Sequence, residues 1–554
     1  MSDRHNPGRR RLIVGAAALT AVTPALLPKR SSSTVAAERE VDGIGAAPFA
    51  DDQNSMVITP QQFGARGDGK ADDGRALAAA LAAIARRPYP GGTITFPGMK
   101  MNLGTSSYVV TDEVDLDIRR TWIEANPAER LFSYGWGTRG ANHAIARPRV
   151  TGGNIRLSGI GRTAFAFQNC DSPLLRDTSI DLLEGAQIGI HVKGLDDPPC
   201  PYYGIVDNVR LSGGSNPVPG DGRIGILFES LPVSGSIAPN RWIFSNLRHI
   251  ASVDYGLDIR GAAGMVGSNI NLEICYKAAI RFGHGARSYT GPITSLIGAG
   301  AGGFKVRGLA GTKLEGSGAI TVNTGANAGY SLPVIMLDTA TGDVILPYGL
   351  PYSFAQGDSI TYTEARANSI RFDNVTYEGS GEAEDFVTFA AGARNCRVVT
   401  AFLTMGTGNA FQRAIEDISN SIAARHETYF YEMELSPTDG KQWLDPSHMS
   451  SVQGGWSIPE GNSWIDSVTI TGSVRSPGSH VGTIEADVFV NGVSQNLKPR
   501  LTHVSPNFAI RVQKSVRTAD FLRPGQPIKI LVTKSGGLRV SERVRVAVRV
   551  GFVG

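Results

Sequence analysis

A group of charged side chains in the middle of the sequence has the composition of a catalytic surface. Its members are Asp258, Glu273, Glu229, Arg281 and Arg260. Two carboxyl groups on one surface can act as proton donor and as nucleophile or base, which glycoside hydrolysis requires. A guanidinium beside a base can instead neutralise a carboxylate and promote proton removal from the adjacent carbon, which is β-elimination. Both chemistries stay open, as does an ordinary solvent-facing ladder of charges that alternate in sign.

A repeated strand pattern places these residues. A frame of alternating apolar and polar residues, opened by Asn or Asp, begins at Asn154, Asp177, Asn208, Asn246, Asn269 and Asn374. The spacings from 154 to 177 and from 246 to 269 are both 23 residues. A second short strand follows each of these frames. Two short strands per repeat at a fixed period predict a solenoid whose coils stack on one another.

The second strand of the repeat predicts one outward-facing charged surface. His191, Asp258 and Arg281 fall in one outward row, and Glu229 and Arg260 fall two residues further on. Adjacent coils lie about 4.8 Å apart, so these side chains should be neighbours on an exposed sheet. We expect Glu273 on the neighbouring strand. The nearby sequence Gly283-His284-Gly285 is interpreted as a turn.

The first strand of the repeat predicts a second outward row. Arg210 and Arg248 align there with Arg156, which suggests a cationic stripe for an anionic polysaccharide. Glu378 also falls at an outward position of this strand. We therefore predict that Arg210, Arg248, His191 and Glu378 contact the ligand. A soluble charged surface without a ligand would show the same pattern.

The segment before the repeat carries a recognisable motif. Residues 63–73 read FGARGDGKADD, a helix is predicted from about Gly74 to Arg87, and residues 91–98 read GGTITFPG. This arrangement resembles the N-terminal cap of the pectate-lyase-like superfamily, which includes rhamnogalacturonase-type enzymes and many phage tailspikes. The resemblance implies an all-β protein built on a right-handed parallel β-helix. It does not fix the reaction, because the superfamily contains lyases, hydrolases, epimerases and proteins that only bind.

The resemblance also implies a function and its partners. We expect an exported enzyme that cleaves a polysaccharide, most reasonably an acidic one, by hydrolysis or β-elimination on the outer face of the helix. The alternative is a tailspike-like protein that binds a polysaccharide or attaches to a surface without catalysis. No metal or other cofactor is predicted from the residues, although the family resemblance allows calcium. A homotrimer is a further expectation from the likeness to tailspikes.

The sequence patterns divide the chain into residues 1–50, which are treated below, and two folded parts. Residues 51–435 are predicted to form the β-helix, with a cap over 56–100 and an insertion at about 286–367. Residues 410–424 have a helical pattern, and residues 436–554 read as a β-sandwich or jelly-roll-like module. The 67 glycines are spread through the whole chain, as many tight turns require. A net charge of +4 over 554 residues argues against a nucleic-acid partner.

The first 50 residues read as a targeting segment. Arg9-Arg10-Arg11 precede an uncharged, mostly apolar run from Leu12 to Leu27, which is short for a membrane span. The pattern resembles a twin-arginine export signal followed by a linker. We therefore expect a periplasmic or extracellular protein without stable membrane insertion after export.

Overall fold

The computed structural model describes most of the chain between residues 57 and 553. The segments outside the description, besides 1–56 and 554, are 87–90, 111–113, 139–144, 186, 196–200, 215, 231–237, 298–302, 315–317, 326, 330, 347–353, 382–383, 414–419, 423–424, 435–439, 445–456, 473, 476–482, 503–507, 513–515, 518–519, 537–538 and 541–542. The predicted export signal and linker over 1–50 therefore lie outside the described residues.

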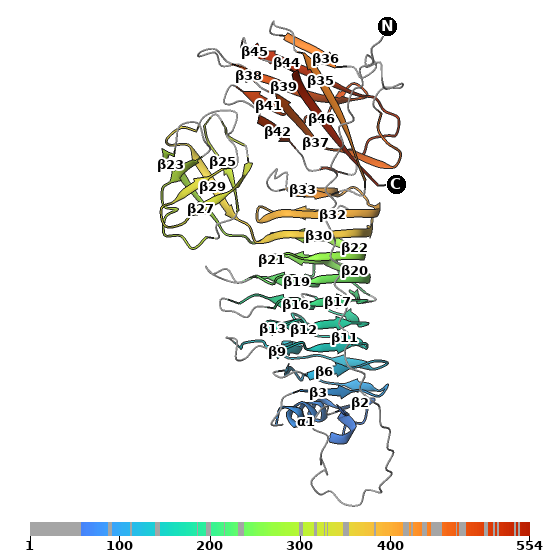
Figure 1. Ribbon diagram of the computed structural model, residues 1–554. Coiled ribbons are helices and arrows are strands. Elements are labelled where there is room, and N and C mark those ends of the chain that lie inside the picture. Colours follow the sequence, from blue (N-terminus) through green and yellow to red (C-terminus); the bar gives the residue numbers. More distant parts are fainter. Residues whose placement is uncertain are drawn as a thin grey trace, which may run out of the picture. The chain divides into compact units, whose positions relative to one another are not determined.

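The main architecture is a parallel β-helix, as the repeat predicted (Figure 1). Its strands pair in three parallel rows, which we call sheets I, II and III. Sheet I begins with β1 (Val57–Ile58), β3 (Gly92–Thr95), β6 (Val114–Asp117), β10 (Arg149–Thr151), β14 (Leu174–Arg176) and β17 (Ile205–Asp207). Sheet II begins with β2 (Asp68–Asp72), β4 (Lys100–Asn102), β7 (Trp122–Ala125), β11 (Asn154–Leu157), β15 (Ser179–Leu182) and β18 (Arg210–Ser212).

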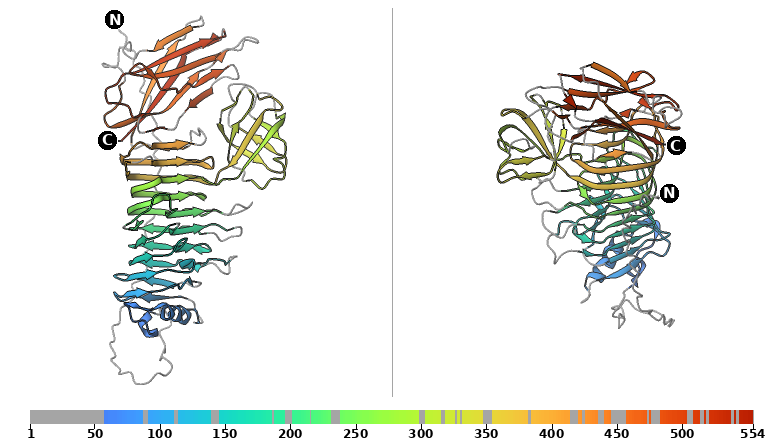
Figure 2. Two further views of the ribbon diagram at one scale, coloured as in Figure 1. Left: turned by 180° about the vertical axis from the view of Figure 1, so that it is seen from behind. Right: turned by 45° about the horizontal axis from the view of Figure 1, so that its top comes forward.

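Sheet III carries the second strand of each repeat. It contains β5 (Tyr108–Val110), β8 (Arg130–Tyr134), β12 (Thr163–Phe167), β16 (Ile188–Lys193), β19 (Ile224–Glu229), β31 (Asp385–Phe389) and β33 (Asn409–Arg413). Longer strands run from one sheet into the next, and the stack of coils is seen from behind in Figure 2. These strands are β20 (Ile243–Ile259), β22 (Val266–Phe282), β30 (Ala367–Glu378) and β32 (Ala393–Thr404).

The interior of the coil is filled by the apolar residues of the alternating strands. Side chains at paired positions stack from coil to coil; for example, Ile155, Ile180 and Leu211 are all at most 1% exposed. Aromatic rings stack in the same way, with 5.6 Å between the centroids of Phe132 and Phe165. Apolar ladders of this kind bury surface only when coils are stacked, so they stabilise the solenoid rather than an isolated repeat.

At the corner between sheets I and II, one residue of each of several coils has a left-handed backbone conformation, and these residues form a column. Asp177, Asn208, Asn246, Asn269 and Asn374 have φ between 52° and 57°. Asn and Asp tolerate this conformation better than other side chains, because they can hydrogen-bond locally. Their side chains also bond along the column, as Asn269 Nδ2 donates to Asn246 Oδ1 at 3.1 Å. The turn role predicted for these five residues is confirmed.

The first frame of the sequence pattern was placed two residues late. Asn154 pairs with Ser179, and Arg156 pairs with Asp181. Gly152, with φ of 82°, occupies the position in its coil that Asp177 occupies in the next. Glycine needs no side-chain hydrogen bond to adopt this conformation, so the corner carries no Asn in this coil.

Two short helical elements close the start of the solenoid. The 3-10 helix η1 (Pro60–Phe63) precedes α1 (Gly74–Ala85), which agrees with the predicted Ala-rich helix. Asp73 is buried, and its Oδ1 accepts the backbone N–H of Arg66 at 2.8 Å. This contact ties the Gly-rich turn to the beginning of α1.

The chain between β22 and β30 forms a separate antiparallel sheet. Its strand order is β26 (Ser331–Val334), β25 (Gly318–Val322), β29 (Ser359–Glu364), β23 (Ser288–Leu296), β24 (Gly303–Val306), β28 (Asp343–Ile345) and β27 (Met336–Asp338). The parallel coil resumes with β30, which pairs directly with β22. The carboxylate of the fully buried Glu364 accepts bonds from Arg287 and Arg366 at both ends of this insertion.

The last part of the described chain forms antiparallel sheets with their own core. One sheet contains β35 (Arg425–Glu434), β46 (Arg543–Val553), β37 (Asn462–Gly472) and β42 (Phe508–Val512). The other contains β36 (Gly440–Leu444), β44 (Ile528–Ser535), β39 (Thr483–Val490), β40 (Val493–Ser494) and β41 (Arg500–Thr502). Buried aliphatic residues from both sheets share one cluster, as a sandwich requires.

The predicted helix over 410–424 is wrong in its described part. β33 spans Asn409–Arg413 and a further strand, β34, spans Ser421–Ile422. Both strands extend the parallel pairing of the coil, to β31 and β32 respectively. Pairing with a ready-made strand edge overrides the weak helical preference of this segment.

Candidate functional site

The outward face of sheet III carries the candidate site. Leu227, Asp258 and Arg281 occupy successive paired positions on β19, β20 and β22. His191 precedes them in the same row, and Glu229 lies two residues beyond Leu227 on β19. This register confirms the alignment that the second strand of the repeat predicted. The structure therefore brings His191, Glu229, Asp258 and Arg281 onto one face, together with Arg260.

Asp258 lies at the centre of this face but is completely buried. Arg281 donates from Nε to Oδ1 at 2.9 Å and from Nη2 to Oδ2 at 2.5 Å. Arg260 donates from Nε to Oδ2 at 2.8 Å. The expectation of an exposed Asp258 was wrong, because strand alternation fixes the direction of a side chain but not what covers it. A carboxylate held in this way positions the two guanidinium groups and is not presented to a substrate.

The two arginines differ in how they reach solvent. The side chain of Arg281 is 11% exposed, and its guanidinium carbon lies 3.8 Å from the ring centroid of Tyr255. The side chain of Arg260 is 35% exposed, and its bond to Asp258 uses Nε alone. Arg260 is therefore the more accessible of the two arginines. Asp258, Arg260 and Arg281 together carry a net charge of +1. The charges of Glu229 and Lys193, which act in the same group, cancel each other, so the face keeps a positive charge that favours an anionic ligand.

A histidine–carboxylate pair lies next to this cluster. His191 Nε2 is 3.1 Å from Glu229 Oε2. The hydrogen bond from His191 lowers the pKa of Glu229, while burial lowers the pKa of His191 despite the opposing effect of Glu229. An ionised Glu229 can only accept, so Nε2 of a neutral His191 carries the proton. The imidazole also packs against Trp136, with 5.1 Å between ring centroids.

His284 is the functional candidate that sequence reasoning passed over. Burial lowers its pKa, and the positive charge of Arg281 lowers it further. The residue is exposed, directly beyond β22, between Gly283 and Gly285 with φ of 68° and 77°. The predicted turn is confirmed, and it presents an imidazole beside the arginine cluster. The Gly-His-Gly triplet was the available signal, but only the three-dimensional position connects it to Arg281.

Asp385 on β31 is a second residue that the sequence did not single out. It follows Ala278 in the sheet III register. Burial raises its pKa, although Asn409 opposes this shift by donating from Nδ2 to Oδ1 at 2.6 Å. Asp385 therefore holds a proton more readily than an ordinary aspartate. No spacing in the sequence indicates this environment, because it depends on the packing of two coils.

Two predicted carboxylates are not part of this site. Glu273 lies on the sheet II part of β22, eight residues before Arg281, or about 25 Å along an extended strand. Its Oε2 is 3.1 Å from Nδ1 of His249. Glu378 pairs with Glu273 in the same sheet. Glu273 is therefore on the strand next to that of Asp258, as expected, but the long strand passes a corner between the two positions, so the two carboxyl groups cannot act as a pair.

The predicted stripe of arginines is also absent from the described structure. Arg210 pairs with His249 rather than with Arg248. The register between β20 and β22 shifts between Leu247 and Ile250, which is a β-bulge that contains Arg248. Arg156 belongs to the row of Asp181 instead. The extra residue and the misplaced first frame together break the alignment, so Arg210 and Arg248 remain exposed but do not form one row.

The described residues contain no group of three or more His, Cys, Asp or Glu side chains that could hold a metal ion. The calcium that the family resemblance allows stays a prediction. In the same part of the chain, no helix combines the length and the apolar character needed to cross a membrane.

Comparisons with known proteins find resemblance at the level of the fold. No protein-family model matches the sequence, and no curated protein sequence matches it. Among solved structures, an iota-carrageenase complexed with iota-carrageenan fragments is 15% identical, with a TM-score of 0.31 over 62% of this chain and 74% of its own. The Acinetobacter phage vB_ApiP_P1 tailspike is 12% identical, with a TM-score of 0.28 over 88% of both chains.

A third structure, the A-module of the mannuronan C-5 epimerase AlgE4 from Azotobacter vinelandii, is 12% identical, with a TM-score of 0.21. It covers 66% of this chain and all of the module. Likenesses this distant do not bear on the reaction or the ligand.

Proposed function

We propose that the protein is an exported enzyme that binds an acidic polysaccharide on sheet III and cleaves it by β-elimination. The observation that carries the proposal is the pair of guanidinium groups that Asp258 fixes beside His284. The cluster has a net positive charge, and the lowered pKa of His284 keeps its imidazole neutral near pH 7. These are the two components that elimination on a uronic acid requires.

In the proposed reaction, Arg260 and Arg281 bind the carboxylate of a uronate unit and disperse the charge that develops on it. His284 takes the proton from the carbon adjacent to that carboxylate. The electron pair of the broken C–H bond forms a carbon–carbon double bond, and the glycosidic C–O bond on the next carbon breaks. The departing oxygen takes a proton from water. The products are an unsaturated uronate and a chain with a new reducing end.

The carboxyl groups of sheet III give less support to hydrolysis. Glycosidases need one protonated carboxyl group and a second carboxylate at about 5–9.5 Å. Asp258 is enclosed by arginines, and the pKa of Glu229 is lowered, so neither suits a proton donor. Asp385 has a raised pKa but lies three strands from Glu229, which is about 14 Å of sheet.

A non-enzymatic polysaccharide-binding protein is the second candidate. It is favoured by Trp136, whose partly exposed ring lies 4.0 Å from the guanidinium carbon of Arg130 and 5.7 Å from Nζ of Lys193. An aromatic ring flanked by cations can stack on a sugar and contact its acidic group without any chemistry.

An assay on polygalacturonate, alginate and dextran separates these functions. New reducing ends together with absorbance of the unsaturated uronate support elimination, whereas reducing ends without that absorbance indicate hydrolysis. Binding without either product supports the second candidate. His284→Gln should abolish elimination, while Arg545→Ala, which removes an exposed arginine paired with Glu432, should leave it unchanged.

We also propose that the protein is exported and that it assembles as a homotrimer. Export rests on Arg9-Arg10-Arg11 and the apolar run that follows, and a periplasmic or culture-medium fraction containing the processed chain would support it. A homotrimer rests on the tailspike-like fold, and the molar mass from light scattering tests it.

A further inference from the structure

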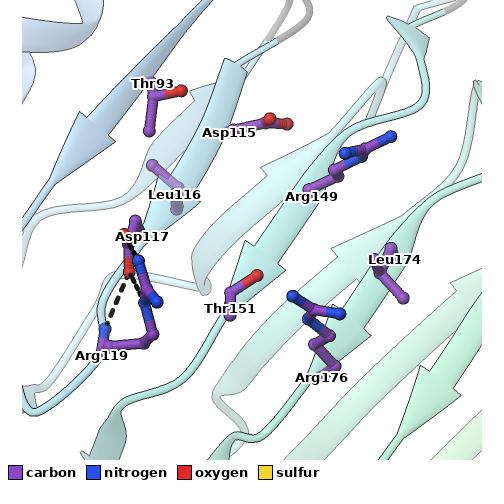
Figure 3. A pocket seen from close by; sticks show the side chains of 9 residues that line it. All are labelled: Thr93, Asp115, Leu116, Asp117, Arg119, Arg149, Thr151, Leu174 and Arg176. Carbon is purple, nitrogen blue, oxygen red and sulfur yellow. Dashed lines mark hydrogen bonds and ion pairs between the residues drawn. The ribbon is translucent and has the colours of Figure 1, made fainter. Parts of the chain in front are cut away.

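A hollow on sheet I has the chemistry of a binding site. Its volume is about 250 Å³, and β3, β6, β10 and β14 supply its walls. Figure 3 shows Asp115, Arg149, Thr151 and Arg176 around it, with Arg119 folded against Asp117. Sheet I is a different face of the coil from sheet III, so this hollow is separate from the arginine cluster around Asp258.

The strand register places two arginines side by side in the hollow. Arg149 pairs with Leu174, and Thr151 pairs with Arg176. Arg149 and Arg176 are therefore diagonal neighbours on adjacent strands, with about 8 Å between their backbone positions. Both residues are exposed. Long side chains at this separation can reach one oxyanion between them.

The charges of the hollow are unevenly balanced. Asp117 is occupied by Arg119, whose Nε and Nη2 lie 2.8 and 2.6 Å from its two oxygens. Arg176 has a loose contact with Asp177 at 3.9 Å, between side chains that are each about half exposed. Arg149 forms no ion pair within 4.0 Å among the described residues. With Asp115 counted, the lining keeps a net charge of +1.

We propose that this hollow binds one acidic sugar unit of a polysaccharide, with Arg149 and Arg176 on its carboxylate or sulfate. Planar guanidinium groups suit both oxyanions. The volume is below the roughly 300–1,000 Å³ of pockets for drug-sized ligands, so it fits a single unit rather than a longer segment. Thr151 lies opposite Arg176 and two residues from Arg149, and its hydroxyl group can bond a sugar hydroxyl (Figure 3).

The surface beside the hollow suits a ligand that continues as a chain. The row that contains Leu174 goes on through three aliphatic residues on successive strands, Ile205, Ile243 and Val266, which are 36%, 43% and 48% exposed. An extended polymer could lie on this uncharged row, whereas a free phosphate ion would have no contact with it. Binding of one polymer at sheets I and III would raise the overall affinity by linking two weak sites.

Affinity electrophoresis of the mature protein tests the second site. The probes are polygalacturonate for carboxylate, a sulfated galactan for sulfate and dextran as a neutral polymer. The double variant Arg149→Ala/Arg176→Ala should bind an acidic probe about tenfold more weakly. The control Arg500→Ala/Arg545→Ala removes two arginines of the C-terminal sheets that are paired with Glu485 and Glu432, and it should bind as the unchanged protein does.

The outcomes separate this inference from the proposed function. Selective loss with either acidic probe supports the site, and the probe affected identifies the oxyanion. An equal loss of affinity in the control variant overturns it, because binding would then depend on overall charge. Equal retardation of the protein by dextran also overturns it, because binding would then be non-specific. The site rests only on an acidic ligand, so the selective loss would stand even if no elimination product is found. Unchanged thermal midpoints verify that all variants are folded.

Discussion

The guanidinium group of Arg281 lies in a two-point contact with Asp258, with 2.9 Å from Nε to Oδ1 and 2.5 Å from Nη2 to Oδ2. The two residues are 23 positions apart, so each coil contributes one partner. This contact between neighbouring coils holds the guanidinium group of Arg281 in one orientation. Because the carboxylate is inaccessible, its function is to hold Arg281 and Arg260 rather than to react.

Removal of Asp258 should destabilise the protein strongly. Asp258→Ala leaves a mostly buried Arg281 without its counterion, and losing one partner of a buried pair costs about 3 kcal/mol or more. Asp373→Ala, which breaks the exposed pair with Arg371, should cost less than about 1 kcal/mol. Urea denaturation measures both values. Similar costs for the two variants would contradict a structural role for Asp258.

The accessible arginine should matter more for turnover than for stability. Arg260→Ala should lower kcat/KM on an acidic polysaccharide by about 10²-fold or more, because a charge-stabilising donor is removed from the transition state. Arg260→Lys keeps the charge but loses the planar fork, so we expect only partial recovery. Steady-state kinetics provide the comparison. Full activity in Arg260→Ala would exclude this residue from the site.

The pH dependence of cleavage should report the base. The pKa of His284 is lowered from 6.5, so the imidazole is already neutral at pH 7 and becomes protonated only in more acidic solution. The rate should therefore be flat around neutrality and fall as the pH drops through that lowered pKa. Measurements of kcat/KM from pH 4 to 8 test this. If kcat/KM still rises above pH 7.5, the titrating base is a group other than His284.

Asp385 gives a stability prediction with a defined sign. Burial raises its pKa in the folded state, so the protein gains stability from protonated Asp385 at low pH and loses it as the pH rises through that raised value. Asp385→Asn removes the charge and should unfold at a higher temperature than the unchanged protein at pH 7. Near pH 3, below the ordinary value of 3.8, the difference should vanish. Thermal unfolding of both proteins at pH 3 and pH 7 measures this. A variant that unfolds at a lower temperature than the unchanged protein at pH 7 would contradict the prediction.

The corner between sheets I and II offers a test of backbone strain. Asn269 has φ of 55° and is bonded to Asn246 and Asn374 on either side. Asn269→Ala should cost roughly 1–2 kcal/mol, because an alanine is strained in the left-handed region. Asn269→Gly should cost less, since glycine adopts this conformation freely. Equal losses would show that the side-chain bonds, rather than the backbone, determine the effect.

Local sequence patterns predicted the solenoid because its periodic contacts repeat the same local rule. The alternation of apolar residues and the Asn at each corner depend on near neighbours, so they are visible in the chain itself. The same rule placed Asp258 opposite Arg281. It failed where a coil departs from the rule, as at Gly152, which replaces an Asn, and at the bulge that contains Arg248.

The covering of the site could not be predicted in the same way. Whether Asp258 is exposed depends on the rotamers of Arg260 and Arg281, which reach over it from their own positions. The altered pKa values of His284 and Asp385 likewise arise from desolvation and from neighbouring side chains in the folded protein. Strand alternation predicts the direction in which each side chain points. It does not predict which neighbouring side chains will cover that side chain.

The antiparallel insertion bears on the order in which the chain folds. β22 must pair with β30 across a segment that begins near Arg287 and ends near Arg366. While that segment is unfolded, it acts as a long tether, and closing it costs conformational entropy. Once folded, it brings its two ends together at Glu364, so the next strand is delivered close to its partner. We therefore expect the insertion to fold before β30 pairs with β22, and the coils after β22 to form only then.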